Sequence, residues 1–148
     1  LDDVCSRIAI INRTFEAGLI DLLGGLRNIW REAGDHETAE LLDGVLADEI
    51  VHVRFGNRWI KKLTEENPRM LIKIASAVRF LSTALAALDT PAEEARKSDP
   101  ELSSGGAPAV NIDDRLEAEF TEEEVKTVLR QAGFHSILPH RLVEEAKA

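Results

Sequence analysis

Glu49 and His52 are the two residues of this chain whose types and spacing are best suited to binding a metal ion. They lie in the segment LLDGVLADEIVHVRFGNRW, residues 41–59, where apolar residues recur with the period of an α-helix. At about 100° per residue, both fall within the apolar stripe of that helix, whereas Asp43 and Arg54 point elsewhere. Because an ionised carboxylate that is buried without a partner costs several kcal/mol, Glu49 needs a compensating cation.

A divalent metal ion is the cation that this pattern favours. Residues three apart share one face of a helix, so Glu49 and His52 can offer an oxygen and a nitrogen to the same ion. Asp48 precedes the pair and can accept the other N–H of the histidine, which would fix its tautomer. Glu16 offers a further carboxylate, one helical turn after Asn12. The predicted metal ligands are Glu16, Glu49 and His52, with Asp48 and Asn12 as their supporting residues.

A structural interpretation of the same residues stays open. Glu-x-x-His pairs occur often in helix-rich sequences, and Glu49 would then pair with an arginine of another helix, with His52 or with a second chain. The other three histidines, His36, His135 and His140, are expected at the surface and are not predicted to be ligands or catalytic residues. Cys5 is expected to be a small buried residue, because no histidine near it in the sequence would activate a thiol.

Helices are expected to position these side chains. The chain has no Tyr and is rich in Ala, Leu, Glu and Arg, which favours an all-α fold. A first helix begins at Leu1 and is expected to bend or end at the glycine pair 24–25, since each glycine weakens a helix interior. The other predicted helices are 36–63 after a stop at Gly34 and a cap at Asp35, 68–88, and 122–132 with a Thr121/Glu124 capping box.

Three parts of the chain differ in composition. Residues 1–90 are predicted to form the helical domain that carries the site. Residues 91–120 are predicted to be a mobile linker, because the stretch 98–111 is rich in Ser, Gly and Pro. Residues 121–148 are predicted to form a C-terminal helix and a polar tail.

Charge and cysteine content exclude several classes of protein. The 148 residues carry 27 acids against 18 bases, a net charge of −9, which opposes binding to nucleic acid. Charges interrupt every apolar segment before the ~20 residues that cross a bilayer, so we expect no membrane association. A single cysteine, with neither a basic start nor a long apolar run at the beginning, favours a soluble, cytoplasmic protein.

Three segments resemble a known family: NRTFEAGLID at 12–21, REAGDHETAELLDGVLADEIVHVRFGNRW at 31–59 and RLEAEFTEEEV at 115–125. They look like the second half of a bacterial ferritin-like family of unknown function, whose members are similar to di-iron carboxylate proteins. The resemblance implies a ferritin-like helical bundle in which Glu16 matches the lone ligand of the third helix. Glu49 and His52 match the ligand pair of the fourth helix.

Only half of a di-iron ligand set is present, because the family's preceding helix pair is absent before Leu1. We therefore expect a half-bundle that is completed by dimerisation or by a missing N-terminal half. Two copies related by a twofold axis would supply four carboxylates and two imidazoles, so a homodimer is predicted.

The predicted function is a metal-binding, di-iron carboxylate oxidase or oxygenase that acts on a small molecule with dioxygen. Manganese or zinc could replace iron, and the sequence does not identify the substrate. The alternative is a non-catalytic, metal-free helical module that serves dimerisation or another interaction, so enzymatic activity is left open.

Overall fold

The computed structural model describes residues 3–98 and 109–148, and of residues 88–98 the backbone alone. Within these ranges the chain is helical and contains no strand, and its β-type pairing is an isolated bridge between Val110 and Ser136. The prediction of an all-α fold is confirmed.

The first structural unit is a long helical rod made of three consecutive segments, α1 (Val4–Ile10), η1 (Ile11–Glu16) and α2 (Ala17–Glu32). Asp3 caps its start by accepting a hydrogen bond of 2.8 Å from the Ser6 N–H. The segment η1 is a π-helix, in which the Ala17 N–H donates to the carbonyl of Asn12, five residues earlier. Such segments place one extra residue in a turn and are frequent at functional sites.

The glycine pair 24–25 does not interrupt the rod, so the predicted bend there is wrong: α2 continues to Glu32. Gly24 is buried, and a Cβ at this position would lie 2.5 Å from Asn111 Nδ2. The glycine therefore serves a close contact with a later part of the chain, and the packing outweighs its low helix propensity.

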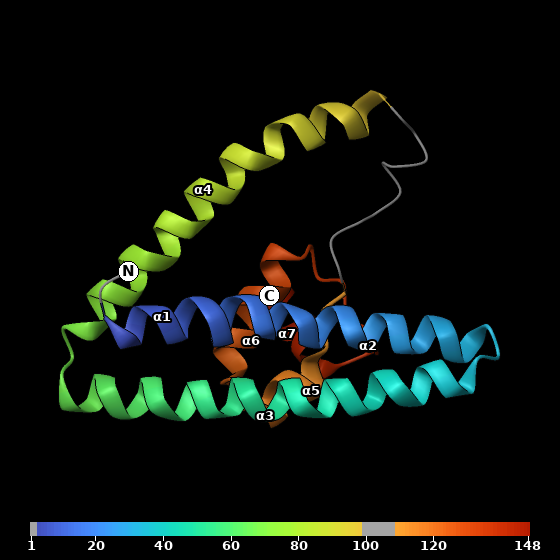
Figure 1. The fold of residues 1–148 in the computed structure, drawn as a ribbon, viewed down its shortest axis with the longest axis horizontal. Helices are drawn as coiled ribbons and strands as arrows, with labels where there is room; N and C mark the ends of the chain where they lie inside the picture. Colours follow the sequence, from blue (N-terminus) through green and yellow to red (C-terminus); the bar gives the residue numbers. More distant parts are fainter. Residues whose placement is uncertain (1–2, 99–108) are drawn as a thin grey trace.

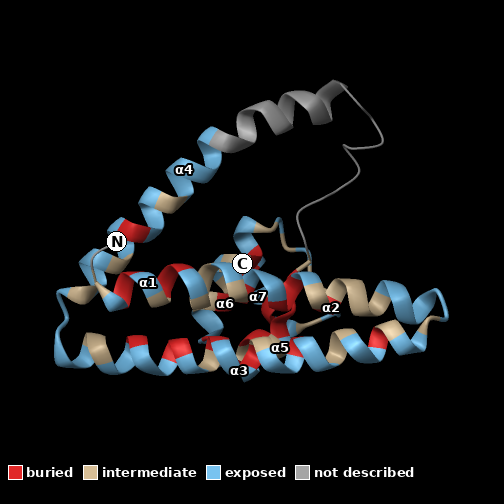
Figure 2. Cartoon of the chain, viewed as in Figure 1, coloured by how far each residue is buried: buried red, intermediate tan, exposed pale blue. Residues whose placement is uncertain are grey.

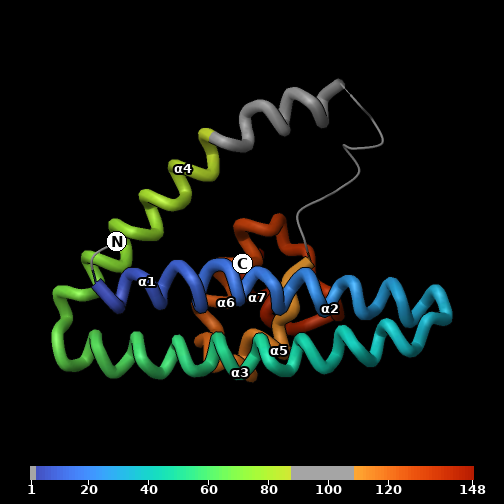
Figure 3. Tube along the Cα trace, viewed as in Figure 1, coloured from blue at the N-terminus to red at the C-terminus, as the bar shows by residue number. Residues whose placement is uncertain are grey.

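The long helix α3 (His36–Glu66) returns antiparallel to the rod and completes a helical hairpin (Figure 1). As predicted, Gly34 adopts a left-handed conformation with φ of 84°, and the Asp35 carboxylate accepts a hydrogen bond from the Thr38 N–H. The Cα trace shows that α2 and α3 run side by side (Figure 3). Buried apolar residues of both helices, including Ile20 and Val53, fill the space between them.

Helix α4 (Met70–Ser98) leaves the end of the hairpin and extends away from it (Figure 1). Its first turns pack against α1 and α3, where Met70 and Ile74 contact a small core of Cys5, Ala9 and Ile60. The buried position of Cys5 agrees with the sequence-based expectation. The predicted end near residue 88 is wrong, because the helix continues past Pro91 into a segment rich in the helix formers Ala and Glu.

By length and composition, the stretch Met70–Ala87 could cross a membrane, with a mean hydropathy of 1.5 and 6% of the stretch buried. A single helix of this kind is weak evidence for a membrane span. The expectation that the protein does not associate with membranes stays a prediction.

The C-terminal part contributes three short helices, α5 (Ile112–Glu117), α6 (Glu122–Gln131) and α7 (Arg141–Lys147). They share one hydrophobic core with the hairpin, and buried residues gather where α5 meets it (Figure 2). The linker predicted over 91–120 does not hold at 109–120, because Val110, Ile112 and Phe120 are buried there. The Ser/Gly/Pro-rich stretch 99–108 lies outside the described residues.

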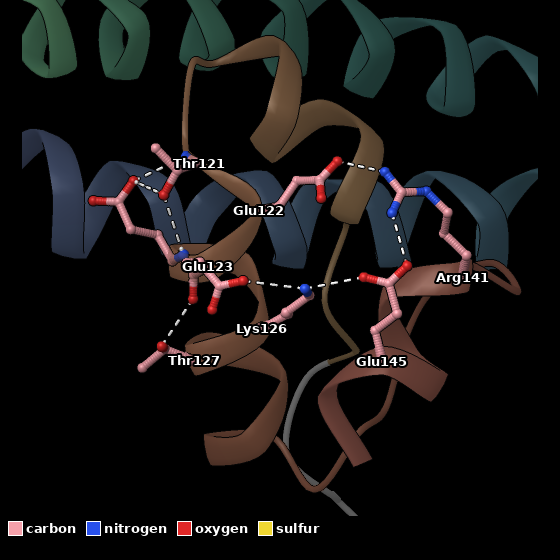
Figure 4. A network of polar contacts seen from close by, with 8 residues as sticks. Thr121, Glu122, Glu123, Lys126, Thr127, Arg141 and Glu145 are labelled. Carbon is pink, nitrogen blue, oxygen red and sulfur yellow. Dashed lines mark hydrogen bonds and ion pairs between the residues drawn. The ribbon is translucent and has the colours of Figure 1, made fainter. Parts of the chain in front are cut away.

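The predicted helix over 122–132 is confirmed, including the Thr121/Glu124 capping box and a left-handed Gly133 with φ of 62°. Helix α7 was not predicted, since its segment reads as a polar tail. Ion pairs join it to α6: Lys126 lies 3.0 Å from Glu145, and Arg141 pairs with Glu122 (Figure 4). His140 caps α7 by accepting a hydrogen bond from the Leu142 N–H.

Candidate metal centre

The candidate centre lies between the rod and α3, near the middle of the hairpin. Glu16 is the last residue of η1, and Glu49 and His52 stand one turn apart on α3. A carboxylate oxygen from each glutamate and a ring nitrogen of His52 all lie within 4.8 Å of one another. The structure thus brings the three predicted ligands together, and their role as metal ligands stays a prediction.

Glu49 occupies the inner side of this cluster. Its side chain is 16% exposed, and its Oε2 atom is buried without a hydrogen-bond partner. The nearby His52 Nδ1 lies 3.5 Å from Oε2, which is too far for a good hydrogen bond. A buried carboxylate oxygen that nothing satisfies is costly, and a bound cation would remove that cost.

His52 differs from the expectation that both groups point inward. Its side chain is 56% exposed and stands at the mouth of the cluster. An open hollow of about 350 Å³ lies there, lined by Asn12, Glu16, Val51, His52 and Phe55. The centre therefore combines one deep carboxylate with a histidine that solvent or a second molecule can reach.

Asn12 joins the two helices at the centre. Its amide Nδ2 donates to Glu16 Oε2 at 2.6 Å and to the backbone carbonyl of His52 at 3.3 Å. A Cβ on Gly56 would lie 2.5 Å from the Cβ of Asn12, so the glycine makes room for this side chain. The predicted place of Asn12 beside Glu16 agrees with these contacts.

Asp48 was predicted to support His52, and the structure does not show this contact. Asp48 is exposed, and in the described ranges it makes no hydrogen bond to His52. The acid that lies closest to the ring is instead Glu49 itself.

Basic side chains around the centre are engaged elsewhere. Arg13, on η1, pairs with Glu124 of α6, and Arg54 pairs with Glu117 at 3.0 Å. Burial raises the pKa of Glu124, but hydrogen bonds from Arg13 and from the Thr121 backbone outweigh it and leave that pKa below its usual value. Among the described residues, no lysine or arginine forms an ion pair with Glu16 or Glu49, so the arginine-pairing interpretation is not what the structure shows.

The sequence reasoning missed an exposed apolar stripe of α3, of which Val51 and Phe55 line the hollow. Val51, Phe55 and Trp59 recur every four residues along α3 and are 56%, 60% and 40% exposed. This spacing forms a second apolar stripe beside the buried one, and it was visible in the sequence as helical periodicity.

Comparison with family models identifies a family that covers most of the chain. The model of the family described as "protein of unknown function (DUF455)" matches residues 1–126. The match includes the rod and α3, and with them all three residues of the cluster. No curated protein and no solved structure matches the chain.

Proposed function

The chain belongs to the DUF455 family of unknown function, which is generally placed in the ferritin-like superfamily, and we propose that it binds a metal ion through Glu16, Glu49 and His52. The observation that carries the proposal is the buried Glu49 Oε2 atom, which lacks a hydrogen-bond partner beside two other donor groups. Structural carboxylates are normally satisfied when buried, so an unsatisfied one within reach of a second carboxylate and an imidazole favours a cation site.

Iron is the metal that we propose, with manganese or zinc as alternatives. Two carboxylates balance the charge of a divalent ion, and no basic side chain of the described residues competes for them. Mixed carboxylate and imidazole ligands are those of ferritin-like iron sites. Three protein ligands leave positions open, as metal-assisted chemistry requires.

We extend the proposal to an oxidase or oxygenase of ferritin-like type that acts on a small molecule. Bound iron would supply electron transfer to dioxygen, and the chain's own residues would set the geometry. Glu49 anchors the ion at depth, and Asn12 orients the Glu16 carboxylate by its 2.6 Å hydrogen bond. Val51 and Phe55 form an apolar wall of the hollow, which favours a substrate with an apolar portion.

Glu49→Gln tests the metal site, because it keeps the shape of the side chain and removes its charge. Protein purified without chelator would be assayed for metal content, and Mn²⁺ affinity would be measured by isothermal titration calorimetry. We expect Glu49→Gln to lose metal and to bind Mn²⁺ at least about tenfold more weakly. Without metal, the free energy of unfolding of the variant should be about 1 kcal/mol higher than that of the wild type, because the variant no longer buries an unpaired charge.

Asp48→Asn is the matched control, because it removes the charge of the preceding, exposed acid on the same helix. It should bind Mn²⁺ as the wild type does. Equal losses in the two variants would mean that general negative charge, rather than the cluster, attracts the ion.

A metal-free interaction module is the second candidate, and the exposed apolar stripe of α3 favours it. Negligible metal in the wild type and in both variants would support this function and overturn the metal site.

A further inference from the structure

Helix α4 carries large apolar side chains along one side that the described part of the chain leaves exposed. Leu71, Val78 and Leu85 recur every seven residues and are 57%, 39% and 40% exposed. Seven residues are close to two turns of a helix, so the three side chains lie nearly in line. The small residues Ala75 and Ser82 fall on the same side, between them. We call these five residues the α4 stripe.

The α4 stripe differs from the side by which α4 packs on the hairpin. Ile74 contacts the small core around Cys5, and Ala77 is 6% exposed. Val78 follows Ala77 and is turned about 100° from it around the helix. Beyond these first turns α4 extends away from the hairpin, and most of its described surface is exposed (Figure 2). A partner can therefore reach the stripe without displacing the contacts that α4 already makes.

A seven-residue repeat is typical of helices that pack against another helix along their length. Here the repeat is self-complementary. In an antiparallel pair centred on Val78, Leu71 of each copy lies opposite the partner's Leu85. Ala75 and Ser82 leave space between these large side chains, which lets two helices approach each other closely.

The distribution of charge favours contact between copies through this stretch. The whole chain has a net charge of −9, whereas Met70–Ala87 contains two bases, Lys73 and Arg79, and no acid. Acidic surfaces that face each other oppose association, and the α4 stripe avoids that cost. An antiparallel pair also places the two acidic hairpins at opposite ends of the contact.

The same stretch is long and apolar enough to cross a membrane, but its polar residues favour a protein partner. Lys73, Ser76, Arg79 and Thr83 fall on the side of the helix opposite to the stripe, at about 100° per residue. All four are exposed. Arg79 lies near the middle of the stretch, where a charged side chain is costly in a bilayer. A partner helix that covers the stripe alone leaves these groups in water.

We propose that the α4 stripe pairs with the same stripe of a second copy of this chain, in an antiparallel contact between two helices. The contact uses no residue of the candidate metal centre and is independent of the proposed function. With about 200 Å² for a large apolar side chain, the exposed parts of Leu71, Val78 and Leu85 amount to on the order of 300 Å² per copy. This is below the roughly 800 Å² per partner of a standard interface, so the dimer is weak and reversible.

Sedimentation velocity of the full chain in chelator, from about 10 µM to about 500 µM, tests the proposal. We expect the sedimentation coefficient to rise towards that of a dimer, with a dissociation constant on the order of 10–100 µM. Val78→Asp places a charge at the centre of the stripe and should give a monomer throughout this range. Phe80→Asp is the matched control, because Phe80 is 71% exposed on the same helix but lies outside the stripe. It should dimerise as the wild type does.

Cysteine cross-linking tests the antiparallel order. Val78→Cys should form a disulfide-linked dimer, because the two copies of this position meet at the twofold axis. Leu71→Cys alone should not, since its two copies lie about 21 Å apart along the axis at about 1.5 Å per residue, and a disulfide needs Cα atoms within about 7 Å. A mixture of Leu71→Cys and Leu85→Cys chains should cross-link. The native Cys5 is 2% exposed and does not compete.

Each of the other outcomes overturns a stated part of the inference. A wild type that stays monomeric overturns the dimer, and a dimer that survives Val78→Asp, or is lost equally in Phe80→Asp, overturns the assignment of the stripe. Cross-linking of Leu71→Cys with itself overturns the antiparallel order. Flotation of the monomer with phosphatidylcholine and phosphatidylglycerol vesicles, abolished by Val78→Asp, would assign the stripe to a lipid surface instead. Circular dichroism of each variant identifies any loss of folding.

These outcomes are separate from those of the proposed function. A chain that dimerises in chelator but binds no Mn²⁺ keeps this inference and overturns the metal site. A monomer that binds Mn²⁺ through the cluster keeps the metal site and overturns the pairing of α4.

Discussion

At the residue scale, the candidate centre depends on one close contact between the two helices of the hairpin. Asn12 can donate hydrogen bonds to Glu16 and to the backbone carbonyl of His52 because Gly56, which packs against the Asn12 side chain, has no side chain of its own. The contact connects the packing of the hairpin with the orientation of a proposed ligand. Changing the packing should therefore change metal affinity.

Gly56→Ala should weaken both folding and metal binding. The new Cβ would lie 2.5 Å from Asn12 Cβ and 3.3 Å from Ile8 Cγ2, so Asn12 must move and its bond to Glu16 is strained. Overpacking of this kind typically costs about 1–3 kcal/mol of unfolding free energy. Urea denaturation measures that loss, and calorimetry with Mn²⁺ measures the accompanying loss of affinity.

Gly44→Ala is the control on the same helix, because a Cβ at Gly44 has no neighbour within 4 Å. It should raise the unfolding free energy by about 0.5–1 kcal/mol through helix propensity and leave Mn²⁺ affinity unchanged. If both variants are stabilised, the contact between Gly56 and Asn12 does not constrain the site.

The grouping of Glu16, Glu49 and His52 was predictable from the sequence, but their depths were not. Helical periodicity places residues three or four apart on one face, which predicts the pair on α3 and puts Asn12 near Glu16. It does not say which side of a hairpin other elements cover. In the structure α5 covers the side of α3 that carries Arg54, and His52 is exposed while Glu49 is mostly buried.

At the element scale, the π-helical segment η1 is the feature that sequence reasoning lacked. An extra residue in a turn shifts the following residues around the helix axis, and within η1 the apolar side chains of Ile11 and Phe15 are 51% and 49% exposed. Asn12 and Glu16 lie within this same segment. Local propensity predicts a helix here but not its hydrogen-bond register.

The contact between η1 and α6 gives a prediction for pH. Arg13 pairs with Glu124 and stacks over Phe120, with 5.0 Å from the guanidinium carbon to the ring centre. Because the pKa of Glu124 is lowered in the folded state, its contribution to stability is present above the usual value of 4.5. That contribution disappears as the pH falls through the lowered pKa.

Glu124→Gln should therefore be less stable than the wild type near neutral pH, with a difference that shrinks in acid. Urea denaturation from about pH 6 to about pH 3 measures the difference. Arg13→Gln removes the other partner and should give the same trend. A difference that is constant with pH would show that the pair does not shift the titration of Glu124.

At the scale of the whole molecule, local signals predicted helices better than they predicted how the helices assemble. Caps and stops at Asp35, Thr121 and Gly133 identified the start of α3 and both ends of α6 to within one residue, whereas α3 ends three residues later than predicted. The packed segment 109–120 was missed because the predicted linker was extended through it from the Ser/Gly/Pro-rich stretch before it, although its own sequence, AVNIDDRLEAEF, contains no Ser, Gly or Pro. Its position is determined by contacts with α2 that are more than 80 residues away in sequence, such as that of Asn111 with Asp21.

A buried ion pair between Asp21 and Arg115 holds the C-terminal part to the hairpin. The side chains are 7% and 6% exposed, and three hydrogen bonds of 2.9, 3.2 and 2.7 Å join them. Arg115 also donates to the carbonyl of Ala17, and the Asn111 N–H donates to Asp21. Every charged group in this contact has a partner. Removing one partner therefore leaves the other charge buried and uncompensated, which lowers the free energy of unfolding.

Arg115→Met should lower the unfolding free energy by about 3–5 kcal/mol, because it leaves the Asp21 carboxylate buried without its cation. Adding Asp21→Asn should recover part of the loss, since the uncompensated charge is then gone. Arg58→Met is the control: its partner Glu119 is solvent-exposed, and urea denaturation should show a far smaller change. Similar losses for Arg115→Met and Arg58→Met would mean that the apolar core alone holds the C-terminal part against the hairpin.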